Sequence, residues 1–178
     1  MATVLKAKMQ KIKDIQRGDV LSYKANDDKY KVLLCIRVDK ERSPHCYWFA
    51  ALTYDAAERP SIEDVCESNF YGTGNSRSES YAYSADELEN MWSWHPEIKP
   101  YFLGAYSYLI WRKDFMSFRD KIELLGNLSI VEHLEKHSGR VTNASSWTFL
   151  SDDRIDRYKT NPFGQEQKTF KVKAILRL

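Results

Sequence analysis

Residues 16–54 read QRGDVLSYKANDDKYKVLLCIRVDKERSPHCYWFAALTY and contain three apolar runs separated by two polar turns. In the middle run, Tyr30 to Val38, the residues at even positions are all apolar, and they alternate with a mixture of basic and apolar residues at odd positions. This period of two is typical of a β-strand. Residues 26–28 and 39–44 supply the two turns, because Asn and Asp side chains bond nearby backbone amides. The stretch therefore predicts an antiparallel meander of three strands.

A chain of 178 residues is long enough for one domain with a buried core and no disulfide staples. We expect a single domain over 1–178, made of an N-terminal arm (1–15), the β-meander (16–54), an acidic aromatic insertion (55–98) and the remaining strands and helices (99–178). The arm is expected to be weakly ordered or a short edge strand, because its apolar residues are too sparse for a helix. The three cysteines, Cys35, Cys46 and Cys66, are widely spaced and form no C-x-x-C pair, which favours a reducing compartment. The sequence has no run of about 18 apolar residues, so we expect a soluble cytoplasmic protein that does not enter a membrane.

Local signals place further elements after the meander. Ser61 is an N-cap candidate for a helical turn, Ser84 to Glu87 form a capping box that predicts a helix over 85–92, and Ser129 to Glu132 form another that predicts a helix ending near 138. Residues 67–83 read as a loop and 140–168 as irregular. Apolar content predicts a buried strand over 101–111, and clean alternation predicts a final strand over 170–178. Residues 112–125 fit a helix over most of their length or a strand at their end.

Charge is uneven along the chain although the total is nearly balanced. Residues 55–98 hold 10 Asp and Glu against 2 Lys and Arg, whereas the segments on either side are basic. Like charges on one surface add their fields and attract a partner of opposite sign. A solvated acidic loop is the simpler interpretation of the same run.

The sequence lacks a glycine-rich phosphate loop, a G-x-S-x-G elbow and an H-E-x-x-H helix, so we expect no catalytic residues and no cofactor. His133 and His137 lie four residues apart, but without a third placed ligand they favour a solvated helix end over a metal site, and we expect no metal. A basic strand face of Lys29, Lys31 and Arg37, interleaved with Tyr30, Tyr47 and Trp48, is a second candidate surface, for nucleic acid. Lysines that protect a sheet edge are the favoured explanation, because the overall charge is too balanced for a typical nucleic-acid binder.

The order GDV, a polar turn, KYKVLLCIRV, a loop and YWFAALTYD resembles the opening of SH3-like barrels of the PemK/MazF kind and of similar barrels among bacterial immunity proteins. The resemblance covers about 40 residues. It implies an α+β fold with an antiparallel, strongly curved β-sheet or SH3-like small barrel, two to three short peripheral helices and a long loop insertion. In endoribonuclease toxins of that fold, an Arg-Pro and a Ser/Thr carry the chemistry, and the nearest positions here are Lys31, with no following proline, and Thr53. Lysine cannot form arginine's planar bidentate fork, which favours a non-enzymatic member of the class.

We therefore expect a non-enzymatic cytosolic protein, an immunity protein that occludes the active site of a cognate toxin or other basic protein. A PemK/MazF-like endoribonuclease and a nucleic-acid-binding regulator are the alternatives. Clustered carboxylates speed association with a basic partner, and aromatic side chains supply buried anchors. The expected partner-binding residues are Asp55, Glu58, Glu63, Asp64, Glu67, Phe70, Tyr71, Tyr81, Tyr83, Asp86, Glu87 and Trp94.

Overall fold

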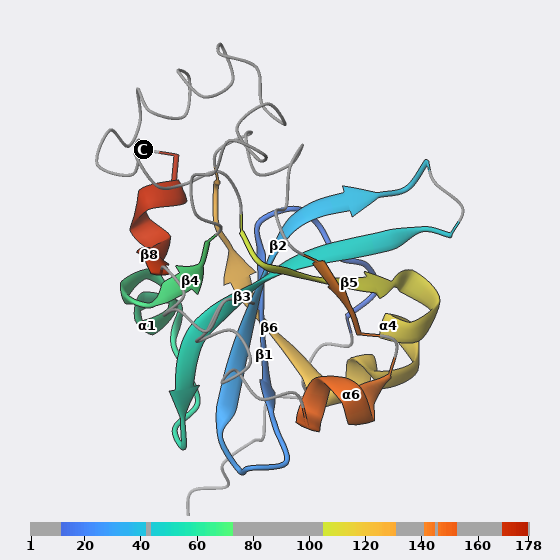
Figure 1. The fold of residues 1–178 in the computed structure, drawn as a ribbon, viewed down its shortest axis with the longest axis horizontal. Coiled ribbons are helices and arrows are strands. Elements are labelled where there is room, and N and C mark those ends of the chain that lie inside the picture. Colours follow the sequence, from blue (N-terminus) through green and yellow to red (C-terminus); the bar gives the residue numbers. More distant parts are fainter. Residues whose placement is uncertain are drawn as a thin grey trace, which may run out of the picture.

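The computed structural model describes residues 12–41, 44–72, 105–130, 141–144, 146–152 and 169–177 (Figure 1). The elements in these ranges are β1 (Asp19–Lys24), β2 (Tyr30–Asp39), β3 (Cys46–Ala56), α1 (Ile62–Glu67), β4 (Asn69–Tyr71), β5 (Ser107–Trp111), α4 (Arg112–Phe118), the 3-10 helix η2 (Arg119–Lys121), β6 (Ile122–Asn127), β7 (Val141–Asn143), α6 (Trp147–Asp152), β8 (Thr169–Lys171) and the 3-10 helix η3 (Val172–Ile175).

The predicted meander is confirmed. β1 pairs antiparallel with β2, with Val20 opposite Leu34, and β2 pairs antiparallel with β3. The turn between β1 and β2 closes with Asp28 at φ 61°, a left-handed conformation that aspartate tolerates better than most residues. The β2–β3 register shifts twice, so this long hairpin is irregular and can bend.

The sheet grows from both sides of the meander and is open. Its main path runs β6-β1-β2-β3-β4-β8. β3 shares its outer edge between two partners, since residues 46–50 pair with β5 and Leu52 pairs with Phe70 of β4. β7 adds to β5 as a parallel strand, while the other pairings are antiparallel. A mostly antiparallel sheet with a few short helices agrees with the expected α+β class.

The meander is buried on both faces. Figure 1 shows α4 and α6 on one side of it and α1, β4 and β8 on the other. Two hydrophobic clusters result, one containing Leu33 and Cys35 and the other Val32 and Leu34. Consecutive residues of β2 are therefore buried, as in a strand covered by layers on both sides.

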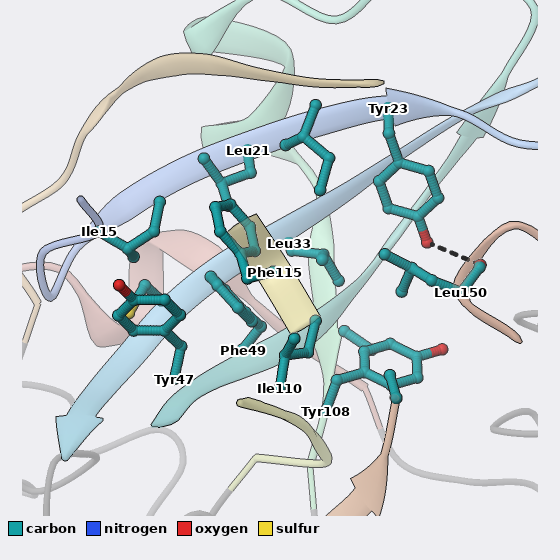
Figure 2. Packing of buried hydrophobic residues seen from close by; sticks show 14 of the residues in the cluster. Ile15, Leu21, Tyr23, Leu33, Tyr47, Phe49, Tyr108, Ile110, Phe115 and Leu150 are labelled. Carbon is teal, nitrogen blue, oxygen red and sulfur yellow. Dashed lines mark hydrogen bonds between the residues drawn. The ribbon is translucent and has the colours of Figure 1, made fainter. Parts of the chain in front are cut away.

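The first cluster is rich in aromatic rings (Figure 2). Phe115 of α4 is completely buried and packs against Tyr47 and Phe49 of β3, with ring centroids 5.6 and 6.0 Å apart. On α6, the Leu150 carbonyl accepts a hydrogen bond from Tyr23, and Trp147 packs edge-on to the same ring. Aromatic packing therefore holds both helices on this face of the sheet.

Residues 112–125 contain both structures that their pattern allowed. α4 buries Phe115 and Phe118, η2 follows, and Ile122 begins strand β6 beside β1. Ser61 caps α1 as predicted, with its hydroxyl accepting from the Asp64 amide at 3.1 Å.

Three expectations need correction. The final strand stops at Lys171, and Val172 to Ile175 turn into a 3-10 helix, in which residues three apart share a face, so both Val172 and Ile175 are buried. The supposedly irregular 140–168 contains β7 and α6. The arm is docked at residues 12–15, where Ile12 and Ile15 are buried in the first cluster.

Several predicted elements lie partly or wholly outside the described residues. The predicted helix over 85–92 and residues 73–83 of the predicted loop lie entirely outside them, as do residues 131–138 of the second capped helix. In the described part of the predicted loop, Glu67 belongs to α1 and residues 69–71 form β4. Of the predicted strand over 101–111, residues 107–111 form β5.

Candidate protein-binding surface

Helix α1 presents three of the predicted carboxylates on the outside of the fold. Val65 is buried beneath the helix, while Glu63, Asp64 and Glu67 are exposed. Two of the three lie in the first turn, where negative charge suits the helix dipole. Because Val65 is the buried residue of α1, the face of the helix that carries the carboxylates points outward.

Tyr54, at the end of β3, lies next to these carboxylates. Its hydroxyl donates to the Glu58 carbonyl at 2.8 Å, and its half-buried ring packs against the second cluster. Burial raises the pKa of Tyr54, and the negative charges of Asp64 and Glu58 raise it further. The phenol is consequently neutral at physiological pH and is held rigidly beside acidic groups. We define the acidic surface as Tyr54, Glu58, Glu63, Asp64 and Glu67.

Not all of these carboxylates are available to a partner. Asp64 completes the capping box, and hydrogen bonds from the Ser61 amide and hydroxyl lower its pKa. Glu67 pairs with Lys173, which lowers the pKa of Glu67. Glu58 and Glu63 have no ion-pair partner within the described part of the chain. They are the carboxylates that carry no visible structural role.

A cation borders this surface and is itself neutralised. Arg59 donates its Nε to Glu123 of β6 at 2.7 Å, and a second nitrogen of the same guanidinium contacts the other carboxylate oxygen. Because this bidentate pair satisfies Arg59, the basic group next to Glu58 does not cancel the charge of the acidic surface.

Asp55 faces a different group. It lies opposite Lys31 of β2, and the Lys31 ammonium bonds to both Asp55 and Asp27. Lys31 is 5% exposed. Burial alone would lower the pKa of Lys31, but hydrogen bonds and charges from the two aspartates outweigh it and raise the pKa. Asp55 therefore balances a buried lysine.

Phe70 and Tyr71 do not line the surface, which corrects their expected place among the partner-binding residues. They are 0% and 4% exposed, and each packs in a core: Phe70 against Phe170 in the second cluster, Tyr71 in the first. Successive residues of a strand point to opposite faces, and both faces of β4 are covered here. The other expected partner-binding residues, Tyr81, Tyr83, Asp86, Glu87 and Trp94, lie outside the described residues.

Tyr54 did not stand out in the sequence as a binding residue, because it closes an apolar strand. The available signal was its position immediately before the acidic run that starts at Asp55.

The basic strand face is divided between separate environments. Lys31 is enclosed by aspartates, and Tyr47 is 0% exposed. At the far end of β2, Arg37 stacks over Trp48 at 5.3 Å and pairs with Asp39. These side chains do not form one continuous stacking platform of the kind that single-stranded nucleic acids use.

The residues nearest to the endoribonuclease positions are also engaged internally. Thr53 accepts a hydrogen bond from the Asn69 amide at 3.1 Å, and the Lys31 ammonium is held by two carboxylates.

Cys66, on α1, is half-buried, and burial raises the pKa of its thiol despite the nearby Lys173. It is therefore a thiol rather than a nucleophilic thiolate at neutral pH.

Among the described residues, no group of three or more His, Cys, Asp and Glu is arranged to hold a metal ion, and His133 and His137 fall outside them. The same residues contain no helix with the length and apolar character needed to cross a bilayer. Comparisons with protein-family models, with curated proteins and with solved structures found no match.

The buried lysine makes a testable contribution to stability. We expect Lys31→Ala to lower the free energy of unfolding by about 2 kcal/mol, because it removes the apolar stem and leaves Asp27 and Asp55 facing each other. Lys31→Met keeps most of the stem and should cost about half as much. Urea unfolding at pH 7 measures both, and equal losses would show that stem packing contributes nothing.

The same cluster predicts an acid-sensitive component of stability. Burial alone would raise the pKa of Asp27, but bonds and charges from Lys31 and Lys29 outweigh it and lower the pKa. A carboxyl whose folded pKa is below its unfolded value stabilises the fold above the unfolded pKa, and this contribution is lost as the pH falls through the folded pKa. In Lys31→Met the folded pKa of Asp27 should lie closer to its unfolded value, so the acid-induced loss should be smaller than in the wild type and should be complete at a higher pH.

Proposed function

We propose that this protein is a cytoplasmic, non-enzymatic immunity protein that binds a basic partner, a bacterial toxin, and covers its active site with the acidic surface. The observation that carries the proposal is the rigid Tyr54 ring among exposed carboxylates, two of which, Glu58 and Glu63, have no ion-pair partner within the described residues. We also propose the relationship to SH3-like barrels that the sequence resemblance implies, with a sheet that is mostly antiparallel but open.

The chemistry of this surface suits a cationic target such as a nuclease. Exposed carboxylates accelerate the encounter with a basic protein, and a pre-positioned tyrosine offers buried contact area at little conformational cost. The hydrogen bond from Tyr54 to the Glu58 carbonyl orients the ring before binding. Pre-organisation of this kind improves affinity because less freedom is lost on association.

The ribonuclease alternative has less support. Its nearest equivalents, Lys31 and Thr53, are each committed to internal hydrogen bonds. We expect wild type and Lys31→Ala to be equally inactive in an RNA cleavage assay. Cleavage by the wild type that the substitution abolishes would favour the enzyme instead.

Charge reversal tests the proposed surface. We expect Glu58→Lys with Glu63→Lys to slow association with the protein encoded by the adjacent gene by about tenfold at low salt and to flatten the salt dependence of the rate. Neither side chain caps α1 or forms an ion pair with a described residue, so the fold should be preserved. Stopped-flow association at several salt concentrations measures the effect.

A matched control is Glu41→Lys with Asp114→Lys, two acidic positions that are not buried and lie near the end of β3 opposite Tyr54: Glu41 follows β2, whose last residue pairs with Cys46, and Asp114 lies in α4, which follows the β5 residue that also pairs with Cys46. These substitutions change the net charge equally but lie away from Tyr54. Equal slowing by both double variants would mean that only net charge matters, and unchanged association in both would remove the acidic surface from the interface.

A further inference from the structure

Residues 12–15 lie over the aromatic part of the first hydrophobic cluster. Ile12 and Ile15 are 6% and 1% exposed and belong to that cluster. Figure 2 shows Ile15 beside the rings of Tyr47 and Phe115. The segment thus covers an apolar surface that the sheet and α4 would otherwise present to solvent.

Side-chain contacts, rather than hydrogen bonds between backbone groups, hold this segment in place. Within the described ranges, residues 12–15 make no backbone-to-backbone hydrogen bond. Their polar contacts are the bond from the Arg119 guanidinium to the Ile12 carbonyl, at 3.1 Å, and those of the Asp14 carboxylate. Firm anchoring begins at Gly18, whose amide donates to the Cys35 carbonyl at 2.7 Å.

Asp14 is the centre of the attachment. The Tyr47 hydroxyl donates to its Oδ1 at 2.5 Å, and Lys40 and Arg112 each bring a nitrogen within 3.9 Å of the carboxylate. These cations come from the loop after β2 and from the start of α4, so one carboxylate joins three parts of the chain. His45 also faces this cluster, with its ring edge-on to Tyr47 at 5.3 Å.

We propose that residues 12–15 form a strap, fastened by the bond between Asp14 and Tyr47, that opens independently of the sheet and uncovers an apolar surface lined by Tyr47 and Phe115. Segments with few backbone hydrogen bonds open at lower free energy than the strands they cover. The hinge lies before Arg17, because the Arg17 guanidinium donates to the Ile36 carbonyl of β2 and the Asn127 side chain of β6 donates to the Arg17 carbonyl.

The charge on Asp14 sets the balance between the closed and open forms. Burial alone would raise the pKa of Asp14, but the bonds from Tyr47 and the Ile15 amide, with the charges of Lys40 and Arg112, lower it. Burial and the bond to Asp14 raise the pKa of Tyr47, so its hydroxyl stays a donor at neutral pH. The strap is accordingly closed at neutral pH, and it loosens as the pH falls through the lowered pKa of Asp14.

Native-state proteolysis of the full chain with thermolysin tests the strap, since this protease cuts before large apolar residues such as Ile12 and Ile15. When opening is fast, the cleavage rate follows the open population. Tyr47→Phe removes the hydroxyl but leaves the strap sequence unchanged. We expect about tenfold faster cleavage within residues 11–15, the size of effect typical of a hydrogen bond to a charged group.

Tyr23→Phe is the matched control, because Tyr23 lies in the same cluster and its hydroxyl bonds instead to Leu150. It should leave strap cleavage unchanged. Asp14→Asn is the second variant, which keeps an acceptor for Tyr47 but removes the attraction of Lys40 and Arg112, and it should also accelerate cleavage. Equal rates in wild type and Tyr47→Phe, or strap cleavage that tracks global unfolding in urea, would overturn the proposal.

Discussion

Replacing Gly18 by alanine is expected to lower the free energy of unfolding by about 3 kcal/mol or more. Gly18 has φ 90°, a conformation that residues with a Cβ rarely adopt. An added Cβ would also overlap the backbone carbonyl oxygen of Leu128, which cannot rotate away as a side chain can. The backbones of Gly18 and Leu128 cannot easily move apart, because the Leu128 amide donates to the Gly18 carbonyl at 2.8 Å. Urea unfolding followed by circular dichroism measures the loss.

Gly126→Ala is the matched control for this substitution. Its Cβ would meet the Ile62 side chain at 3.4 Å, an ordinary contact that a small rotation relieves, and its φ lies outside the left-handed region. We expect a change of less than about 1 kcal/mol. If both substitutions cost the same, loss of glycine flexibility alone, rather than the clash at Gly18, would explain the effect.

Phe115→Ala should lower the free energy of unfolding by about 3 to 5 kcal/mol. The side chain is 0% exposed and packs against three rings, those of Tyr47, Phe49 and Phe118. Truncation leaves a cavity between α4 and the sheet that rigid neighbouring rings fill poorly. Thermal or urea unfolding measures the effect directly.

The control is Lys113→Ala, two residues earlier on the same helix and exposed. Its expected effect is within about 0.5 kcal/mol. A loss below about 1 kcal/mol in Phe115→Ala would contradict the packing described here, since it would mean that α4 contributes little to the stability of the sheet.

Part of the acidic surface could be predicted from the sequence. Composition identified Glu58, Glu63, Asp64 and Glu67 as members of an acidic run, and the Ser61 cap placed Glu63 and Asp64 on a helical turn, whereas Glu67 was expected to begin a loop. The sequence could not show that Asp64 serves the cap or that Glu67 pairs with Lys173, more than a hundred residues away in the chain. Pairing over such separations depends on how β4, β8 and η3 meet.

The errors concerned aromatic residues and the chain ends. Phe70 and Tyr71 were assigned to a surface because they follow an acidic helix in a polar context, but β4 lies between β3 and β8 and buries both. The arm has apolar residues too sparse for a helix and was expected to be weakly ordered or a short edge strand. Two isoleucines are nevertheless enough to dock residues 12–15 on the aromatic part of the first cluster. Local sequence does not reveal the surface that a segment will meet.

The sequence by itself determined the local structure: the strands of the meander through their period of two, and the start of α1 through Ser61. Only the tertiary structure decided which residues became surface. It covered both faces of β2, enclosed Lys31 between two aspartates, and left Tyr54 beside exposed carboxylates. The physical reason is the distance along the chain over which each interaction acts. Turns, caps and periodicity act between near neighbours, whereas burial and charge pairing depend on segments brought together by folding.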